Sequence, residues 1–105
     1  MRLSVFVAAV LIVSIPANYA ASRSQRERGA VVFAECGCIH CHSIRNAGGR
    51  KGPDLSGVGG RLKEAELRRQ ILQGGMLMPS FRDALQGAEL ADLIAYLRSC
   101  RDKQN

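Results

Sequence analysis

The sequence lacks the features that define several common classes of protein. No segment alternates apolar and polar residues with period two, so a sheet-based fold is not expected. No internal repeat is visible, and 105 residues suffice for one domain only. The longest apolar run, residues 3–15, falls short of the about 20 residues that span a bilayer as a helix. A single all-α domain is therefore the expected fold class.

The first 21 residues differ in character from the rest of the chain. A positively charged second residue precedes the apolar run, which only two serines interrupt, and Pro16 and the small residues Ala20–Ser22 follow it. A charged start, a short apolar stretch and a small-residue exit are typical of a secretory signal peptide. We therefore predict a signal peptide over residues 1–21, with cleavage near residues 20–22, and an exported, periplasmic domain over residues 22–105.

The exported domain would be small and rich in cysteine. A domain of about 80 residues is usually marginal without a disulfide, a metal or a cofactor. Export also places its cysteines in an oxidising compartment, where they either pair or are used by a ligand. The use of these residues therefore decides how the domain is stabilised. The four cysteines are Cys36, Cys38, Cys41 and Cys100.

The chain is basic, with a formal net charge of +6 that falls to +5 when Arg2 leaves with the signal peptide. Such a surface suits an acidic protein patch or an anionic membrane, or it is simply a solvated surface. The basic residues are scattered, and only the pairs Arg50–Lys51 and Arg68–Arg69 are adjacent. An exported chain of this kind is not expected to bind nucleic acid.

Three helical segments are predicted, over about residues 25–36, 63–73 and 88–101. Ser24 and Glu27 form the S-x-x-E capping box that marks the start of the first helix. The second has acidic residues in its first turn and arginines near its end, an order that suits the helix dipole. The third has a continuous apolar face, which predicts that it packs against the core.

Two long loops are predicted, one before the second helix and one between the second and third helices. Residues 46–60 contain six glycines and one proline, and a further loop covers residues 76–86. Loops of this length are unusual in a compact domain. They make sense if they wrap a large flat ligand.

One motif carries most of the chemistry. Cys38, Cys41 and His42 form the pattern C-x-x-C-H, the attachment signature of c-type haem. Two thiols about one helical turn apart can each add to a haem vinyl group, and the next imidazole then faces the iron from the same side. We therefore predict one haem c, bound covalently through Cys38 and Cys41, with His42 as the proximal ligand.

Three other uses of these cysteines remain open. A thioredoxin-like redox pair would need a surrounding βαβ pattern, which the sequence does not have. A disulfide in a plain secreted domain is the second. The third is zinc, which usually draws its ligands from two separated pairs, whereas the only distant cysteine here stands alone. The zinc candidates are Cys36, Cys38, His40, Cys41 and His42.

The sixth iron ligand is predicted to be Met78. It precedes Pro79 in a loop opened by Gly74–Gly75, more than 30 residues beyond the haem motif, so its thioether can close over the opposite haem face. Methionine is also a common gap-filler in cores. Met76, a lysine or an open iron are the alternatives, and His40 is held on the proximal side by its neighbours.

Six short motifs follow one another along the chain: Gly29 with Phe33, Cys38–His42, Gly52–Leu55, Gly57–Arg61, Met78–Phe81 and Leu93–Leu97. In their order and spacing they resemble the class I cytochromes c of bacteria. The resemblance covers about residues 28–99, and only the haem motif is specific by itself.

This resemblance implies the cytochrome c-like fold, with three main helices and long loops wrapped around one covalently attached haem. It also implies that the Pro53 carbonyl accepts a hydrogen bond from the His42 ring, which fixes the ring and tunes the ligand. Arg61 is implied to pair with a haem propionate.

The resemblance further implies that the terminal helices cross, with Gly29 and Phe33 packed against Leu93 and Tyr96. Two features depart from the family pattern. The chain has no tryptophan, which supplies a propionate contact in some relatives. The stretch from Phe33 to Cys38 is also longer than usual, so the resemblance does not fix the end of the first helix.

Cys36 and Cys100 lie outside the haem motif, and the resemblance places them at different ends of the helix crossing. Three fates remain open: a disulfide between them, an inert Cys36 beside the haem site, and intermolecular pairing through Cys100 on an exposed tail.

A haem held between His42 and Met78 has no free coordination site, so its expected work is one-electron transfer, and the chain is not expected to be an enzyme. We predict a soluble shuttle between redox proteins with acidic docking patches. One alternative is a haem-bearing subunit permanently bound to a larger periplasmic dehydrogenase or oxidase complex at a membrane. The other is a haem sensor or weak peroxidase with an open sixth site.

Overall fold

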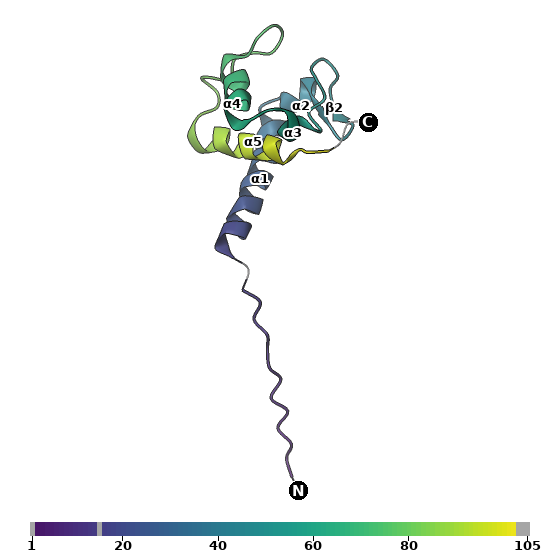
Figure 1. Cartoon of the computed structure of the whole chain (residues 1–105), viewed down its shortest axis with the longest axis vertical. Helices are drawn as coiled ribbons and strands as arrows, with labels where there is room; N and C mark the ends of the chain where they lie inside the picture. Colours follow the sequence, from purple (N-terminus) through teal and green to yellow (C-terminus); the bar gives the residue numbers. More distant parts are fainter. Residues whose placement is uncertain (1, 15, 103–105) are drawn as a thin grey trace.

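The computed structural model describes residues 2–14 and 16–102, apart from the side chains of residues 18–23. Ile15, the last residue of the predicted apolar run, and residues 103–105 of the predicted domain lie outside this part. Figure 1 shows a helical domain with an extended N-terminal segment that points away from it. The elements are α1 (Ala17–Glu35), α2 (Cys38–Cys41), β1 (Ser43–Ile44), β2 (Ala47–Gly48), α3 (Val58–Arg61), α4 (Glu64–Gln73) and α5 (Gly87–Ser99).

The apolar side chains of residues 3–13 are exposed and do not pack against the domain. Residues 2–14 are not helical, and Leu3 and Phe6 are 92% and 93% exposed. Of the helices in the described ranges, none has the length and apolar character that crossing a membrane requires. The backbone at the expected cleavage region, residues 20–22, is part of α1. The signal peptide remains a prediction.

The predicted start of the first helix is wrong. Helix α1 begins at Ala17, with Pro16 as its N-cap, and it runs through Ser24 to Glu35. Ser24 therefore caps nothing, and its hydroxyl oxygen instead accepts a hydrogen bond from the Arg28 guanidinium at 2.8 Å. The S-x-x-E pattern is short enough to occur inside a helix, where an (i, i+4) partner can take up the serine.

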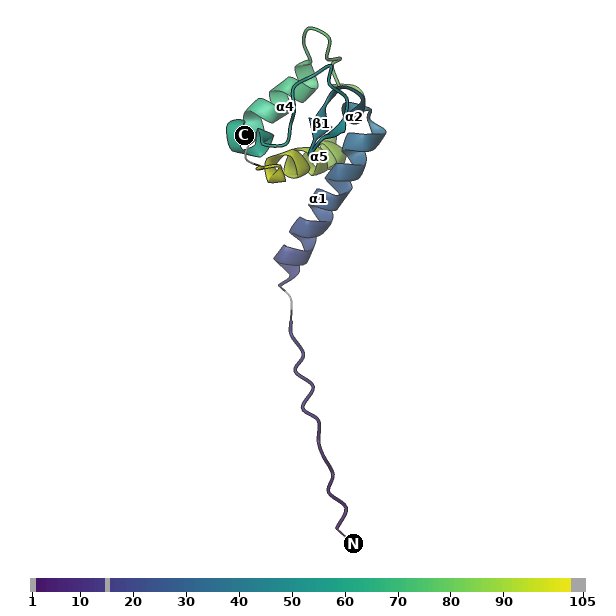
Figure 2. The ribbon, with the colours of Figure 1, turned by 90° about the vertical axis from the view of Figure 1, so that its right-hand side faces the viewer.

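The main contact of the fold is the crossing of α1 and α5, which both views of the ribbon show (Figures 1 and 2). The Phe33 and Tyr96 rings meet edge to face, with their centroids 5.8 Å apart. Arg28 of α1 donates to the buried carboxylate of Asp92 of α5 at 3.0 Å, which links the two helices further. The core around it consists of Val32, Phe33, Ile44, Val58, Leu67, Ile71, Leu85, Leu90, Leu93, Ile94, Leu97 and Cys100.

At Gly29, α1 packs directly against the α5 backbone. A Cβ atom there would lie 2.0 Å from the Asp92 carbonyl oxygen and 2.6 Å from the Tyr96 Cβ. We expect Gly29→Ala to destabilise the haem-loaded protein by about 2 kcal/mol, because overpacking outweighs alanine's higher helix propensity. Thermal unfolding followed by circular dichroism checks this. Gly60→Ala, where no atom lies within 4 Å, is the matched control, and an equal loss there would contradict the prediction.

The other two long helices agree with their predicted ranges. Helix α4 spans residues 64–73, and α5 spans residues 87–99 with Gln86 as its N-cap. The expectation of no strand is wrong in one place, because Ser43–Ile44 pairs antiparallel with Ala47–Gly48. Arg45 and Asn46 connect these strands with φ values of 52° and 66°. Positive φ at both central residues is typical of a tight hairpin turn, which needs no long alternating strands.

Candidate functional site

The haem motif is folded as one short helix followed by an extended residue. Gly37 precedes α2 with a left-handed φ of 80°, which a glycine adopts without strain. Helix α2 then carries both Cys38 and Cys41. His42 leaves the helix with extended backbone angles, and its N–H donates to the Cys38 carbonyl at 2.9 Å. The motif thus places two thiols on one short helix and an imidazole at the residue that ends it.

One nitrogen of the His42 ring is already bonded. Its Nδ1 lies 2.8 Å from the Pro53 carbonyl oxygen. Since that oxygen can only accept, Nδ1 carries the hydrogen and Nε2 keeps its lone pair for a metal. Gly52 lies against the ring, because a Cβ atom there would be 2.7 Å from His42 Cε1 and 2.8 Å from Nδ1. The sequence reasoning named Pro53 but missed this contact of Gly52.

The Cys38 thiol, the first of the motif, is not poised as a redox nucleophile. Burial, together with the neighbouring Cys36, raises the pKa of Cys38 to about 11. Burial also raises the pKa of Cys36, and Glu89 adds to the effect. A thioredoxin-type nucleophile has a lowered thiol pKa instead. The electrostatics therefore argue against the redox-pair interpretation.

Met78 and Met76 lie in clearly different surroundings. They belong to a tight turn in which the Gly75 and Met78 backbones exchange two hydrogen bonds of 2.9 Å. Met78 is half-buried against the core, whereas Met76 at the tip is fully exposed. Gln70 of α4 donates to the Met78 sulfur at 3.7 Å. Nothing in the sequence pointed to Gln70, because its contact depends on how the loop folds back over α4.

Arg61 lies at the end of α3, beside the loop that holds His42. Its guanidinium is exposed and donates to the Asp54 carbonyl oxygen at 3.1 Å. The residue is therefore tied to the backbone directly after Pro53.

The residues present fit a covalently bound haem. The chain offers an imidazole with Nε2 available, two thiols one helical turn apart, and a thioether from a separate loop. Half-buried apolar side chains next to the core supply further surface that a flat apolar ring could cover; among them are Cys38, Leu55, Leu72, Met78 and Phe81. Within the part of the chain described, no group of three or more His, Cys, Asp or Glu side chains could hold a metal ion.

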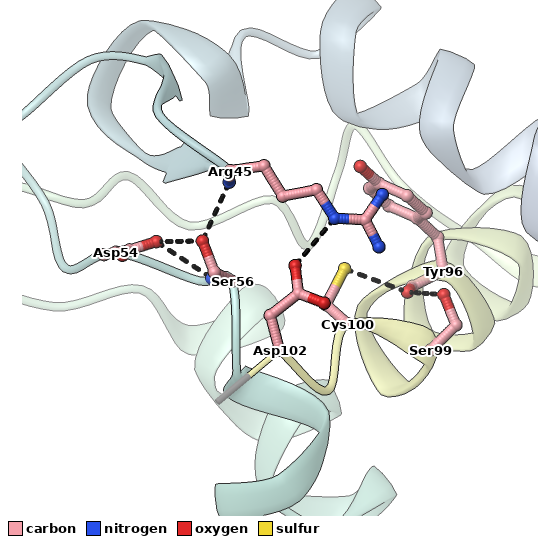
Figure 3. Close-up of polar contacts among 7 residues, drawn as sticks. All are labelled: Arg45, Asp54, Ser56, Tyr96, Ser99, Cys100 and Asp102. Carbon is pink, nitrogen blue, oxygen red and sulfur yellow. Dashed lines mark hydrogen bonds and ion pairs between the residues drawn. The ribbon is translucent and has the colours of Figure 1, made fainter. Parts of the chain in front are cut away.

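Cys36 and Cys100 are both free thiols. Cys100 is 5% exposed, and its thiol donates to the Tyr96 carbonyl at 3.4 Å (Figure 3). Burial raises its pKa, so it stays protonated at neutral pH. Of the three fates left open for these cysteines, pairing through Cys100 on an exposed tail does not fit, because the residues after α5 fold back on the domain.

In comparison with known proteins, the model of the family described as Cytochrome C oxidase, cbb3-type, subunit III, matches residues 24–97. No curated protein and no solved structure matches the chain.

Proposed function

Because the chain belongs to the family described as Cytochrome C oxidase, cbb3-type, subunit III, a family of c-type cytochrome domains, we propose that it is an exported one-electron carrier with a single haem. The haem is attached through Cys38 and Cys41, and His42 and Met78 bind its iron. When bound, haem supplies the one-electron chemistry. The chain attaches the group, orients its ligands and keeps water away.

The observation that carries the proposal is the hydrogen bond between His42 Nδ1 and the Pro53 carbonyl. This bond fixes the tautomer in which Nε2 carries no hydrogen and is available as a ligand. His42 directly follows Cys41, the second thiol of the motif, in the sequence. A pyridine haemochrome spectrum of protein made with the haem-attachment machinery tests the proposal. The spectrum should be that of a haem with two thioether links, at one haem per chain. A spectrum without haem would return the chain to the zinc or disulfide alternatives.

Export is part of this proposal, because haem attachment of this kind and a cleaved signal belong together in the predicted periplasmic setting. Mature protein from a native source should lack residues 1–21 by mass spectrometry of the intact chain. A mature chain that keeps them would contradict export with cleavage.

A second candidate is a haem-bearing subunit that stays bound to a larger oxidase, and the family description favours it. The two candidates share the haem site and differ in assembly. Gel filtration of a mild native extract separates them: a free shuttle elutes as a small protein, whereas a bound subunit elutes with the complex.

The partner is proposed to carry an acidic docking patch. A hollow of about 450 Å³ on α4 is lined by Glu64, Ala65, Arg68, Arg69, Leu72, Gln73 and Arg82. Arg68 pairs with Glu64 at 3.5 Å, but within the described ranges the guanidinium groups of Arg69 and Arg82 have no ion-pair partner. In the loop that follows α4, Met76 and Leu77 are fully or almost fully exposed. Two unpaired cations at this hollow and an exposed apolar loop after α4 suit a partner that offers both carboxylates and apolar surface.

Reversing the two unpaired charges should slow encounter with such a partner. We expect the Arg69→Glu, Arg82→Glu double variant to react about tenfold more slowly at low salt with a small acidic copper protein as the probe. The difference should vanish at high salt, where charges are screened. Stopped-flow spectroscopy measures the rate. The Arg26→Glu, Arg101→Glu variant carries the same change of charge elsewhere on the exposed surface, and an equal slowing there would leave only net charge as the cause.

A further inference from the structure

We propose that Ser56 is a positioning residue for His42. Together with Arg45 and Asp102 it fixes the loop that carries the Pro53 carbonyl, and it thereby sets how strongly the imidazole donates to the iron. The proposal rests on the proposed function, because it requires that His42 binds haem iron.

The Pro53 carbonyl depends on its neighbours for its position. Proline has no N–H, so this residue makes no backbone donor contact of its own. Its neighbours anchor the loop to the haem motif instead: the Gly52 N–H donates to the Cys41 carbonyl at 2.7 Å, and the Leu55 N–H donates to the Ser43 carbonyl at 2.8 Å. A shift of this loop would therefore pass directly to the hydrogen bond of the His42 ring.

Ser56 links this loop to the turn that follows His42. Its side chain is buried, and its hydroxyl oxygen accepts the Arg45 backbone N–H at 2.8 Å. Arg45 has a φ of 52° in that turn. This left-handed conformation is strained for a residue with a side chain, and it persists only where surrounding contacts offset the strain. The hydroxyl in turn donates to Asp54 Oδ1 at 2.6 Å, and the Ser56 N–H donates to the same oxygen at 2.9 Å (Figure 3).

The Asp54 carboxylate is suited to receive both bonds. The two hydrogen bonds from Ser56 hold the pKa of this carboxyl below its ordinary value, so it is ionised at neutral pH. Charge-assisted hydrogen bonds are stronger than neutral ones. Asp54 follows Pro53 directly, so these bonds stiffen the chain at the carbonyl that His42 uses.

The C-terminal segment closes the network. The Asp102 N–H donates to the Ser56 carbonyl at 3.0 Å. Arg45 Nε lies 2.6 Å from Asp102 Oδ2 (Figure 3). The Gly59 N–H also donates to the Cys100 carbonyl at 2.8 Å. The Arg45–Asp102 pair is exposed, and such pairs contribute little by themselves. The buried hydroxyl of Ser56 is therefore the contact on which the network depends.

The test is Ser56→Ala in the haem-loaded, reduced protein. Hydrogen exchange of the His42 Nδ1 proton, followed by NMR, should become about tenfold faster, which is the effect of losing one hydrogen bond of ordinary net strength. The reduction potential should rise, because a weaker bond to Pro53 makes the imidazole a poorer donor and stabilises ferric iron less. If the substitution only loosened the structure around the haem and admitted water, the reduction potential would fall instead. The direction of the change in potential therefore separates a positioning role from a general loss of structure.

Two further variants keep the test decisive if Ser56→Ala folds poorly. Asp54→Ala removes an exposed side chain and should shift exchange and potential in the same directions. Ser56→Thr retains the hydroxyl and should restore both values toward those of the wild type. Ser99→Ala is the matched control, because it removes a serine hydroxyl that donates to the Tyr96 carbonyl at 2.6 Å, outside the network.

The outcomes distinguish this inference from the function on which it rests. Wild-type protein that takes up no haem would overturn the proposed function. Protein that takes up haem and shows His42 ligation, but whose exchange rate and potential stay unchanged in Ser56→Ala and Asp54→Ala, would overturn the role of Ser56 alone. A fall in potential in both variants would also overturn it, since solvent access would then be the cause.

Discussion

Replacing Cys38 and Cys41 together by alanine is expected to release haem from the chain. In the wild type, two thioether bonds should keep haem with the protein in acidified acetone, whereas the double variant should lose essentially all of it. The reason is that each thiol can form one bond to a vinyl group, and coordination by His42 does not survive acid. Absorbance of the acetone phase after extraction measures the loss.

The chain contains its own control for this experiment. Cys36 and Cys100 are also free thiols, and neither belongs to the motif. The Cys36→Ala, Cys100→Ala double variant should therefore keep all of its haem. If acidified acetone extracted as much haem from the wild type as from the Cys38→Ala, Cys41→Ala variant, covalent attachment would be contradicted. If the control lost haem, Cys36 or Cys100 would carry one of the links.

The Cys38→Ala, Cys41→Ala variant should also lose cooperative unfolding. A domain of about 80 residues buries a modest share of its surface. The apolar cluster lies mainly on α1, α4 and α5, while the loops before α4 and α5 contribute few of its members. We expect the loops to depend on haem for their order, so the haem-free variant should melt broadly by circular dichroism. A sharp transition would show that the protein core suffices alone.

The sequence predicts those parts of the fold whose signals are local. Helices α4 and α5 carry their charges and apolar faces at helical spacing, and the predicted ranges are correct to within two residues at each end. The C-x-x-C-H motif predicts c-type haem, and the six motifs together predict a c-type cytochrome, which the family match over residues 24–97 confirms. For the helices and the haem motif, the information lies within about a dozen neighbouring residues.

The parts that the sequence did not predict depend on contacts between distant segments. Helix α1 extends back to Ala17, and the β1–β2 pair depends on left-handed angles at Arg45 and Asn46, two residues whose types alone do not demand a turn. Cys100 is buried because the chain after α5 returns to Ser56 and Gly59. A one-dimensional pattern carries no record of such long-range contacts.

The same limit applies to the site. The spacing in the motif identified Cys38, Cys41 and His42 as candidate ligands, and the family resemblance added Pro53, whose carbonyl lies 2.8 Å from the ring. Ser56 gave no signal, because a serine in a glycine-rich loop looks like any turn residue. Residues that hold a ligand in place are harder to predict than the ligand itself.

Met78→Ala is expected to convert the carrier into a ligand-binding haem protein. The structure separates the two methionine candidates, since Met78 is half-buried against the core while Met76 is fully exposed at the tip of the turn. Pro79 restricts the Met78 backbone to extended angles, and Gly74, with a φ of 65°, lets the chain turn back after α4. Phe81, three residues after Met78, packs against the core. We expect it to help exclude water, the competitor of a weak thioether bond.

Loss of that thioether should have three measurable effects. The weak near-infrared band of methionine-bound ferric haem should disappear, and the ferrous protein should bind carbon monoxide. The reduction potential should fall, because a thioether favours ferrous iron; each tenfold loss in that preference lowers the potential by about 59 mV, and we expect at least one such step.

Met76→Ala is the matched control, because it removes the same side chain two residues away from a fully exposed position. It should change none of the three properties. If the two variants behaved the other way round, Met76 would be the ligand and the tip of the turn would have to fold inward on haem binding. If wild-type ferrous protein already bound carbon monoxide rapidly, the sixth site would be open. The chain would then be a haem sensor or a weak peroxidase, because an iron that accepts an external ligand is free to do more than pass an electron.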